Sequence, residues 1–169
     1  MSDVFTLLQD DHRKVEQLFG QFEQTGDYAV AMQICDELTV HATVEEELIY
    51  SLYRSNVDTD GADHAREEHQ QAKDIITRIE ALGPEGDGLA DAVQELKASV
   101  EHHVQEEENV FFPRMAAAIP ETVGLLGNDI VHRKAQLLEL RGEDKATGLS
   151  SSTSGQKPVA SPATPGTGD

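Results

Sequence analysis

Apolar residues recur at steps of three and four through most of the chain, and polar residues fill the positions between them. This spacing places the apolar side chains along one side of an α-helix. It predicts four long helices, which run from near residue 2 to about 24, from 27 to about 56, from about 62 to 82 and from about 88 to 118. Polar or glycine-rich segments separate them, and Pro113 is expected to kink or break the fourth helix before its end.

The composition changes near the C-terminal end of the sequence. Pro120 suits the first turn of a fifth, shorter helix, and beyond Arg141 the chain is rich in Ser, Thr, Pro and Gly. Such a segment buries too little apolar surface to offset the entropy of ordering. We therefore predict an all-α protein, in which an antiparallel up-down-up-down four-helix bundle with a short fifth helix spans residues 1–141 and a disordered tail spans residues 142–169.

Within the apolar series of two predicted helices, a histidine and a glutamate stand four residues apart, His41 with Glu45 and His103 with Glu107. Side chains at this spacing leave the same side of a helix. In both helices it is the apolar side, because the pairs fill gaps in two regular apolar series: Ile34, Leu38, Leu48 and Leu52, and Leu89, Val93, Leu96, Val100 and Val110. Burying a carboxylate without a partner is costly, so a metal ion is the leading candidate for that partner.

The apolar sides of the four predicted helices meet along a buried seam. The first and third helices each add one histidine to this seam, His12 and His69. Four imidazoles and two carboxylates are too many ligands for one tetrahedral zinc ion. They suit two metal ions, each bound by two histidines and bridged by the glutamates. Nitrogen and oxygen ligands with open positions favour iron, although the same set accepts manganese or zinc. The alternative is a hydrogen-bonded polar core without metal.

Further polar residues are assigned by their position relative to the seam. Three carboxylates are candidates for orienting the histidine rings: Glu46, Glu68 and Glu108. Three histidines lie off the apolar series and are expected at the surface: His64, His102 and His132. Cys35 has no second cysteine to pair with and is expected as a small buried hydrophobe.

The net charge of −19 disfavours nucleic acid and anionic membrane surfaces as partners, because both require a basic patch. No apolar run approaches the roughly 20 residues of a membrane span. Residues 1–13 lack the basic and apolar regions of a secretory signal. These features predict a cytoplasmic protein.

The runs HATVEEELIYS and HVQEEENVFFP, together with His12 and His69, resemble the hemerythrin-like family of cation-binding four-helix bundles over about residues 1–140. The resemblance implies a non-haem di-iron centre with oxo or hydroxo and carboxylate bridges. It implies four terminal ligands, His12, His41, His69 and His103, and two ligands that bridge the irons, Glu45 and Glu107. The ferritin-like alternative needs Glu three residues before a histidine, which this chain nowhere has.

This sequence lacks one metal ligand that the dioxygen-carrying members of that family have. They carry a fifth histidine one turn along the third helix, where this sequence has Ala65 or Lys73. A more open centre favours chemistry on hydrogen peroxide or nitric oxide over reversible dioxygen carriage. Tyr50 and Tyr53 follow the first motif. A phenol near iron could ligate it or be oxidised, but a boundary position with the hydroxyl in water is the expected one.

The function expected from these features is that of a di-iron protein that binds or reduces a small oxidant in cytoplasmic stress defence. The candidate oxidants are hydrogen peroxide, dioxygen and nitric oxide, and whether the protein is an enzyme is left open. A sensing or metal-binding module without turnover is the second hypothesis. Iron storage is the third, although one centre per chain gives it little capacity.

Overall fold

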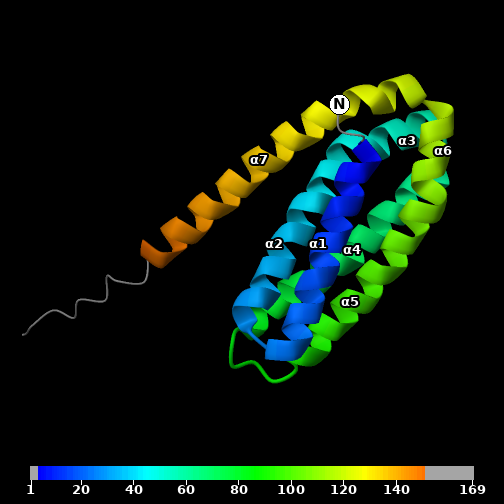
Figure 1. Cartoon of the computed structure of the whole chain (residues 1–169). Coiled ribbons are helices and arrows are strands. Elements are labelled where there is room, and N and C mark those ends of the chain that lie inside the picture. The colour runs from blue at the N-terminus through cyan, green and yellow to red at the C-terminus, as the bar shows by residue number, and fades with distance from the viewer. Residues whose placement is uncertain (1–3, 151–169) are drawn as a thin grey trace, which may run out of the picture.

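The computed structural model describes the backbone of residues 4–150 and the side chains of residues 4–142. Four helices lie side by side along this range: α1 (Val4–Thr25), α2 (Tyr28–Val44), α4 (Thr59–Leu82) and α5 (Leu89–Glu106) (Figure 1). The helices α1 and α2 form one antiparallel pair, and α4 and α5 form the other. The predicted four-helix bundle is confirmed.

Each of the two helices that carry a His–Glu pair contains a π turn. The helix α2 continues through η1 (Glu45–Ile49) into α3 (Tyr50–Asn56), and α5 continues through η2 (Glu107–Phe111) into α6 (Phe112–Ala118). In each turn a backbone N–H donates to the carbonyl five residues earlier, from Tyr50 to Glu45 and from Phe112 to Glu107. Each turn thus holds one residue more than an α-helical turn.

The extra residue moves the buried side of each helix by one position. The apolar series placed Val110 in the core, but its exposed fraction is 51%, and Phe111 and Phe112 are buried instead. In the first half Leu48 is only half-buried, whereas the next residue, Ile49, is fully buried. The predicted series is therefore wrong past both motifs, because a period of 3.6 residues does not continue through a π turn.

Aspartate side chains cap two of the bundle helices. Asp27 accepts a hydrogen bond from the Ala29 N–H at 2.9 Å and caps α2, as a residue at this position is expected to do. Asp58 accepts from the Asp60 N–H at 3.2 Å and caps α4. This second cap starts α4 at Thr59, three residues before the start that the apolar series predicts.

The helix α7 (Pro120–Ser150) crosses the outside of α1 and α2 and, at 31 residues, is much longer than the short fifth helix predicted (Figure 1). Three apolar side chains anchor it: Val123, Leu126 and Ile130. Its backbone stays helical through residues 142–150, which the prediction assigned to the tail. Residues 1–3 and 151–169 lie outside the described residues, so the tail itself stays a prediction.

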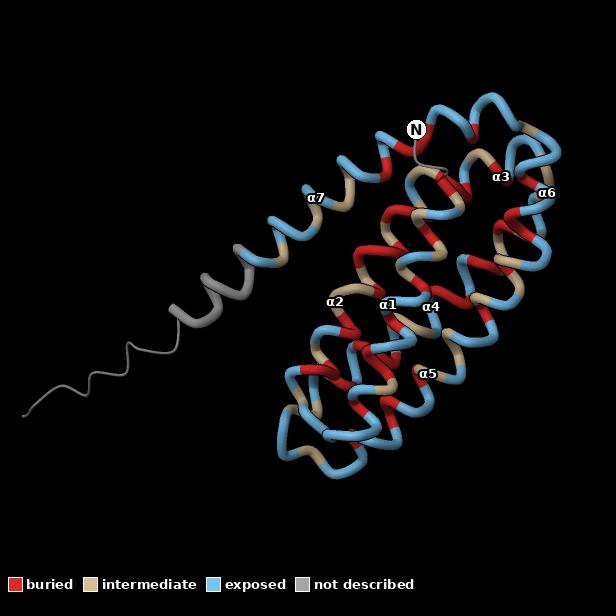
Figure 2. The backbone as a smooth tube through the Cα atoms, viewed as in Figure 1, coloured by how far each residue is buried: buried red, intermediate tan, exposed pale blue. Residues whose placement is uncertain are grey.

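Buried residues recur along the helices of the bundle (Figure 2). They form two apolar clusters with a polar layer between them. One cluster includes Val15, Ile34 and Ile76, and the other includes Leu8 and Ile49. Among the described side chains, the buried polar ones all fall in the layer between: His12, His41, Glu45, Glu68, His69, His103 and Glu107. The fold thus isolates a set of ionisable groups from water.

Candidate metal centre

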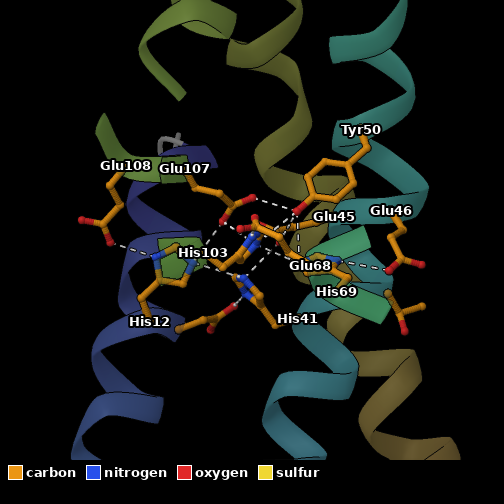
Figure 3. A network of polar contacts seen from close by, with 12 residues as sticks. His12, His41, Glu45, Glu46, Tyr50, Glu68, His69, His103, Glu107 and Glu108 are labelled. Carbon is orange, nitrogen blue, oxygen red and sulfur yellow. Dashed lines mark hydrogen bonds and ion pairs between the residues drawn. The ribbon is translucent and has the colours of Figure 1, made fainter. Parts of the chain in front are cut away.

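The bundle brings all six predicted seam residues together in this layer (Figure 3). The four histidines form two pairs: the Nε2 atoms of His12 and His41 lie 3.2 Å apart, and those of His69 and His103 lie 3.0 Å apart. Glu45 and Glu107, the two remaining seam residues, lie between the pairs (Figure 3). The choice of His103 over its neighbour agrees with the structure, since the side chain of His102 is 64% exposed.

Two groups of these side chains have the spacing of metal ligands. One offers four ligand atoms within 4.8 Å of one another, from His12, His41, Glu45 and Glu107. The second offers three, from Glu45, His69 and His103. Glu45 belongs to both groups, which suits a carboxylate that joins two ions. The assignment of the six residues as ligands stays a prediction, supported by this placement.

Each histidine is oriented by a carboxylate from a neighbouring helix, which accepts a hydrogen bond from the Nδ1–H. The bonds run around the bundle as a closed ring: Asp11 to His41 (3.3 Å), Glu46 to His69 (3.1 Å), Glu68 to His103 (2.7 Å) and Glu108 to His12 (2.8 Å). A proton on Nδ1 leaves the Nε2 lone pair directed into the centre, where it can bind a metal.

Three of these four outer carboxylates were predicted, and Asp11 was missed. A signal was present in the sequence, because each of the four is adjacent in sequence to a seam residue. Asp11 stands directly before His12, just as Glu68 stands directly before His69. The orienting residue serves the histidine of the next helix around the bundle, which the sequence of one helix does not reveal.

Basic side chains neutralise three of the outer carboxylates from outside. Lys134 of α7 donates to Asp11, Lys73 donates to Glu46 at 2.6 Å, and Arg13 donates to Glu108 at 2.5 Å. The layer and its outer ring hold six carboxylates and only these three Lys or Arg partners among the described residues. The remaining negative charge requires protons or metal ions.

Two buried oxygens of the central glutamates show whether these residues fit a metal ion. Glu45 Oε1 and Glu107 Oε2 are buried and accept no hydrogen bond among the described residues. An unpaired buried carboxylate oxygen is costly. Imidazole nitrogens and carboxylate oxygens that face one another are the donor set of iron, manganese and zinc sites. The residues present therefore fit a metal centre.

Opposite charges within the layer shift the pKa values of these groups. Burial lowers the pKa of His41, but the carboxylates of Glu45, Asp11 and Glu107 outweigh it and raise that pKa to about 10. Burial raises the pKa of Glu107, but His103 and the other histidines hold it well below its usual range. The layer therefore favours positive charge among its carboxylates, and metal ions can replace the protons.

Tyr50 lies inside the centre, and the expectation of a hydroxyl in water is wrong. Its side chain is fully buried, its hydroxyl donates to Glu107 Oε1 at 2.9 Å, and the same oxygen lies 3.1 Å from His69 Nε2 (Figure 3). Burial, followed by the charges of Glu107 and Glu45, raises the pKa of this phenol well above its ordinary value. The π turn causes this placement, because it directs residue 50 inward.

The repeat counterpart of Tyr50 in the second half is Phe112, which follows Glu107 by the same five residues. The Phe112 ring stacks on His12, with ring centroids 6.1 Å apart and an angle of 6° between the planes. One histidine pair is therefore approached by a phenol and the other by a phenyl ring, so the two halves of the centre differ chemically.

A buried layer of histidines and glutamates in a four-helix bundle defines a metal-binding helical bundle. The family model of the hemerythrin HHE cation binding domain matches residues 3–115. The chain belongs to this family. Among the described residues, no helix is both long and apolar enough to cross a membrane.

Two curated relatives are similar to this chain over part of their length. A DNA nickase of Nostoc sp. is 31% identical over 114 residues, which cover 65% of this chain and 32% of that protein. An uncharacterized hemerythrin-like protein of Schizosaccharomyces pombe is 25% identical over 132 residues, which cover 74% of this chain and 65% of that protein. The chain thus spans less than two thirds of either relative, and no solved structure matches it.

Proposed function

We propose that the centre holds two iron ions and that the protein binds and reduces small oxidants, hydrogen peroxide first, in cytoplasmic stress defence. His12 and His41 would hold one ion, His69 and His103 the other, and Glu45 and Glu107 would bridge them. The two ligand groups and the unpaired glutamate oxygens support two ions. The metal identity rests on the nitrogen and oxygen donor set and on the family.

The difference between Tyr50 and Phe112 is the observation that carries the proposal. The Tyr50 hydroxyl lies against the His69–His103 pair, at 3.1 and 3.3 Å from the two Nε2 atoms. The His12–His41 pair has the Phe112 ring in the corresponding place, which offers no donor or ligand atom. We infer that an external ligand binds on the side of His12 and His41, whereas Tyr50 occupies the other side.

The space beside the histidines fits a molecule of two heavy atoms. A cavity of about 30 Å³ lies against all four rings, and its remaining wall is mainly apolar, with Val15, Leu38 and Ile76 among its residues. A cavity of this volume holds one or two water-sized molecules. Hydrogen peroxide, dioxygen and nitric oxide are of this size, and larger organic substrates are not.

The chemistry proposed for peroxide is disproportionation, in which two molecules of hydrogen peroxide give two of water and one of dioxygen. The two irons would supply the electron exchange and Lewis acidity. Tyr50 would hold and return a proton at its hydroxyl, and Glu107, which accepts this hydrogen bond and also faces the His12–His41 pair, would pass the proton to the ligand on that side. The outer carboxylates would hold the Nδ1 proton of each histidine and so keep Nε2 directed at the ions, and the apolar clusters on both sides would exclude bulk water.

The relative that is called a DNA nickase does not extend the proposal to nucleic acid. The shared region covers 32% of that protein, and the net charge of −19 disfavours binding to phosphate backbones. A sensing or metal-binding role without turnover is the remaining alternative.

Peroxide turnover by the iron-loaded protein tests the proposal. We expect catalytic loss of hydrogen peroxide with one dioxygen released for every two peroxides, and no such activity in Glu45→Ala, which cannot join the ions. A protein with two irons that leaves peroxide unchanged would support the sensing or binding role. A folded protein that takes up no iron would contradict the di-iron proposal altogether.

A further inference from the structure

The outer carboxylate Glu68 differs from the other three of the ring. Asp11, Glu46 and Glu108 each pair with a lysine or an arginine, but among the described residues Glu68 has no such partner. Its Oε2 accepts from His103, and its Oε1 faces two further histidines, His64 and His102. Lysine or arginine balances the negative charge of the other three carboxylates, whereas, in the described part of the chain, only imidazoles face the charge of Glu68.

Two additional His–Glu pairs form the surface around Glu68. His64 with Glu68 on α4 and His102 with Glu106 on α5 each repeat the four-residue spacing of the central motifs. Because α4 and α5 are neighbours, the two pairs face each other. Of the four side chains only that of Glu68 is buried, at 9% exposure, while the other three reach solvent.

Three of these residues, His64, Glu68 and Glu106, offer ligand atoms within 4.8 Å of one another, and His102 lies against the same two carboxylates. The Nε2 of His64 lies 3.6 Å from Glu68 Oε1 and 3.3 Å from Glu106 Oε2. The Nε2 of His102 lies 3.4 Å from Glu68 Oε1 and 3.6 Å from Glu106 Oε1. Zinc binds such atoms tetrahedrally at about 2.0–2.1 Å, which places neighbouring ligand atoms roughly 3.3–3.4 Å apart.

Solvent and ions can reach this cluster from outside. A groove of about 210 Å³ runs between α4 and the α5–α6 helix, and His64, Glu68 and Glu106 line it together with His103 and Glu107 of the centre. The cluster therefore lies where the groove meets the buried layer, and Glu68 belongs to both.

We propose that His64, Glu68 and Glu106, with His102 as the fourth ligand, form a second, surface site for one zinc ion. Glu68 binds the ion through Oε1 while Oε2 keeps the hydrogen bond to His103. The site thus joins the surface to the centre through one carboxylate. None of the six central residues is a ligand of this site, so zinc binding at the surface can be measured separately from the proposed peroxide chemistry.

A zinc titration of the full, iron-loaded chain tests this site. We expect calorimetry to show one zinc ion bound per chain while the iron, measured by elemental analysis after gel filtration, stays in the protein. The double substitution His64→Ala/His102→Ala and the isosteric Glu106→Gln should each weaken that binding by at least about tenfold, since loss of even an outer partner of a ligand typically costs about that much. His132→Ala, which removes another exposed histidine, is the matched control and should bind as the wild type does.

Three outcomes would overturn the surface site. These are zinc binding that releases an equal amount of iron, zinc binding that is unchanged in the double variant, and no zinc binding at all. The iron count before the titration reports on the central site separately. If the centre contains no iron, zinc also fills it, and the surface site still predicts one zinc fewer in the double variant than in the wild type.

Discussion

At each histidine of the centre, the nitrogen that faces outward is held by a carboxylate of the next helix around the bundle. This ring of Asp11, Glu46, Glu68 and Glu108 fixes both the ring orientation and the position of the proton. The centre is therefore specified by ten residues in addition to Tyr50: the six seam residues and the four carboxylates that orient their histidines.

Asp11 is the orienting residue that most directly tests this role, because an exposed aspartate precedes it. We predict that Asp11→Ala lowers metal affinity by about 10–100-fold, since His41 loses the partner that fixes its proton. Asp10→Ala removes an equal charge one residue away and should leave the affinity unchanged. Competition with a metal chelator measures both variants, and equal affinities would show that the charge alone matters.

A substitution at Tyr50 should distinguish metal binding from turnover. We predict that Tyr50→Phe keeps both irons but slows peroxide loss by roughly 100-fold or more, which is the typical contribution of a positioned proton donor. Tyr53→Phe is the matched control, because Tyr53 is equally buried but stacks on Phe111, 3.6 Å between ring centroids, away from the histidines. Elemental analysis and oxygen evolution measure the two properties, and an unimpaired Tyr50→Phe variant would remove the phenol from the mechanism.

At the scale of the helices, the π turns set which residues reach the centre. Both turns begin at a central glutamate, and both direct the residue five positions later inward, Tyr50 in one half and Phe112 in the other. Pro113 is not the reason for the turn, because Ser51 stands at the equivalent position in the first half and the same turn forms there. The turn instead belongs to both halves of the repeat and lies directly at the central glutamates, as π turns often do at functional sites.

A pair of neighbouring alanine substitutions tests the register beyond the second π turn. Phe111→Ala should destabilise the protein by about 3–5 kcal/mol, because it empties a buried position. Val110→Ala should change stability by no more than about 0.5 kcal/mol, because Val110 is exposed. Urea unfolding measures both, and a costly Val110→Ala would mean that an uninterrupted α-helix runs through Glu107.

The sequence predicts the helices and the seam because both depend on a regular period. His12, His41, His69 and His103 lie on apolar series that the bundle buries as expected. The period cannot reveal an inserted residue, so Val110 was placed inside and Tyr50 at the boundary. Asp11 was missed although it stands beside His12, and only the fold shows that it orients His41 of the next helix. The length of α7 was missed because its backbone continues into the segment with the composition of a tail.

At the scale of the whole molecule, α7 connects the outside of the bundle to the centre. Lys134 pairs with Asp11, which orients His41, while Arg133 donates at 2.6 Å to Glu47, which lies within the first π turn. Lys134 lies beyond residues 3–115, the part that the family model matches. The charge balance of the centre therefore depends on a segment outside that match.

The pH dependence of stability tests the charge balance. The pKa of His41 is raised from 6.5 to about 10, so its pairing stabilises the metal-free fold fully below about pH 6.5 and is lost as the pH rises toward 10. The pKa of Glu107 is lowered from 4.5, so its contribution is present above about pH 4.5 and is lost in acid. We predict that the metal-free protein has its highest melting temperature between these values.

Bound metal should reverse this trend above about pH 6.5, because ligand histidines must be unprotonated and protons compete less as the pH rises. The difference in melting temperature between metal-loaded and metal-free protein should therefore grow from about pH 6 to pH 9. Calorimetry on chelator-treated and reloaded protein measures it. A difference that stays constant or shrinks over this range would contradict the exchange of protons for metal.

The most direct measurement of the central claim is the metal content of the purified, folded protein. The account predicts close to two irons per chain, loss of the metal with a lower melting temperature in Glu45→Ala, and retention of both central irons in His102→Ala. Circular dichroism verifies the helical fold in each case. A wild-type protein that is well folded yet binds no metal when iron is supplied would contradict the account, because the seam residues would then form a hydrogen-bonded polar core.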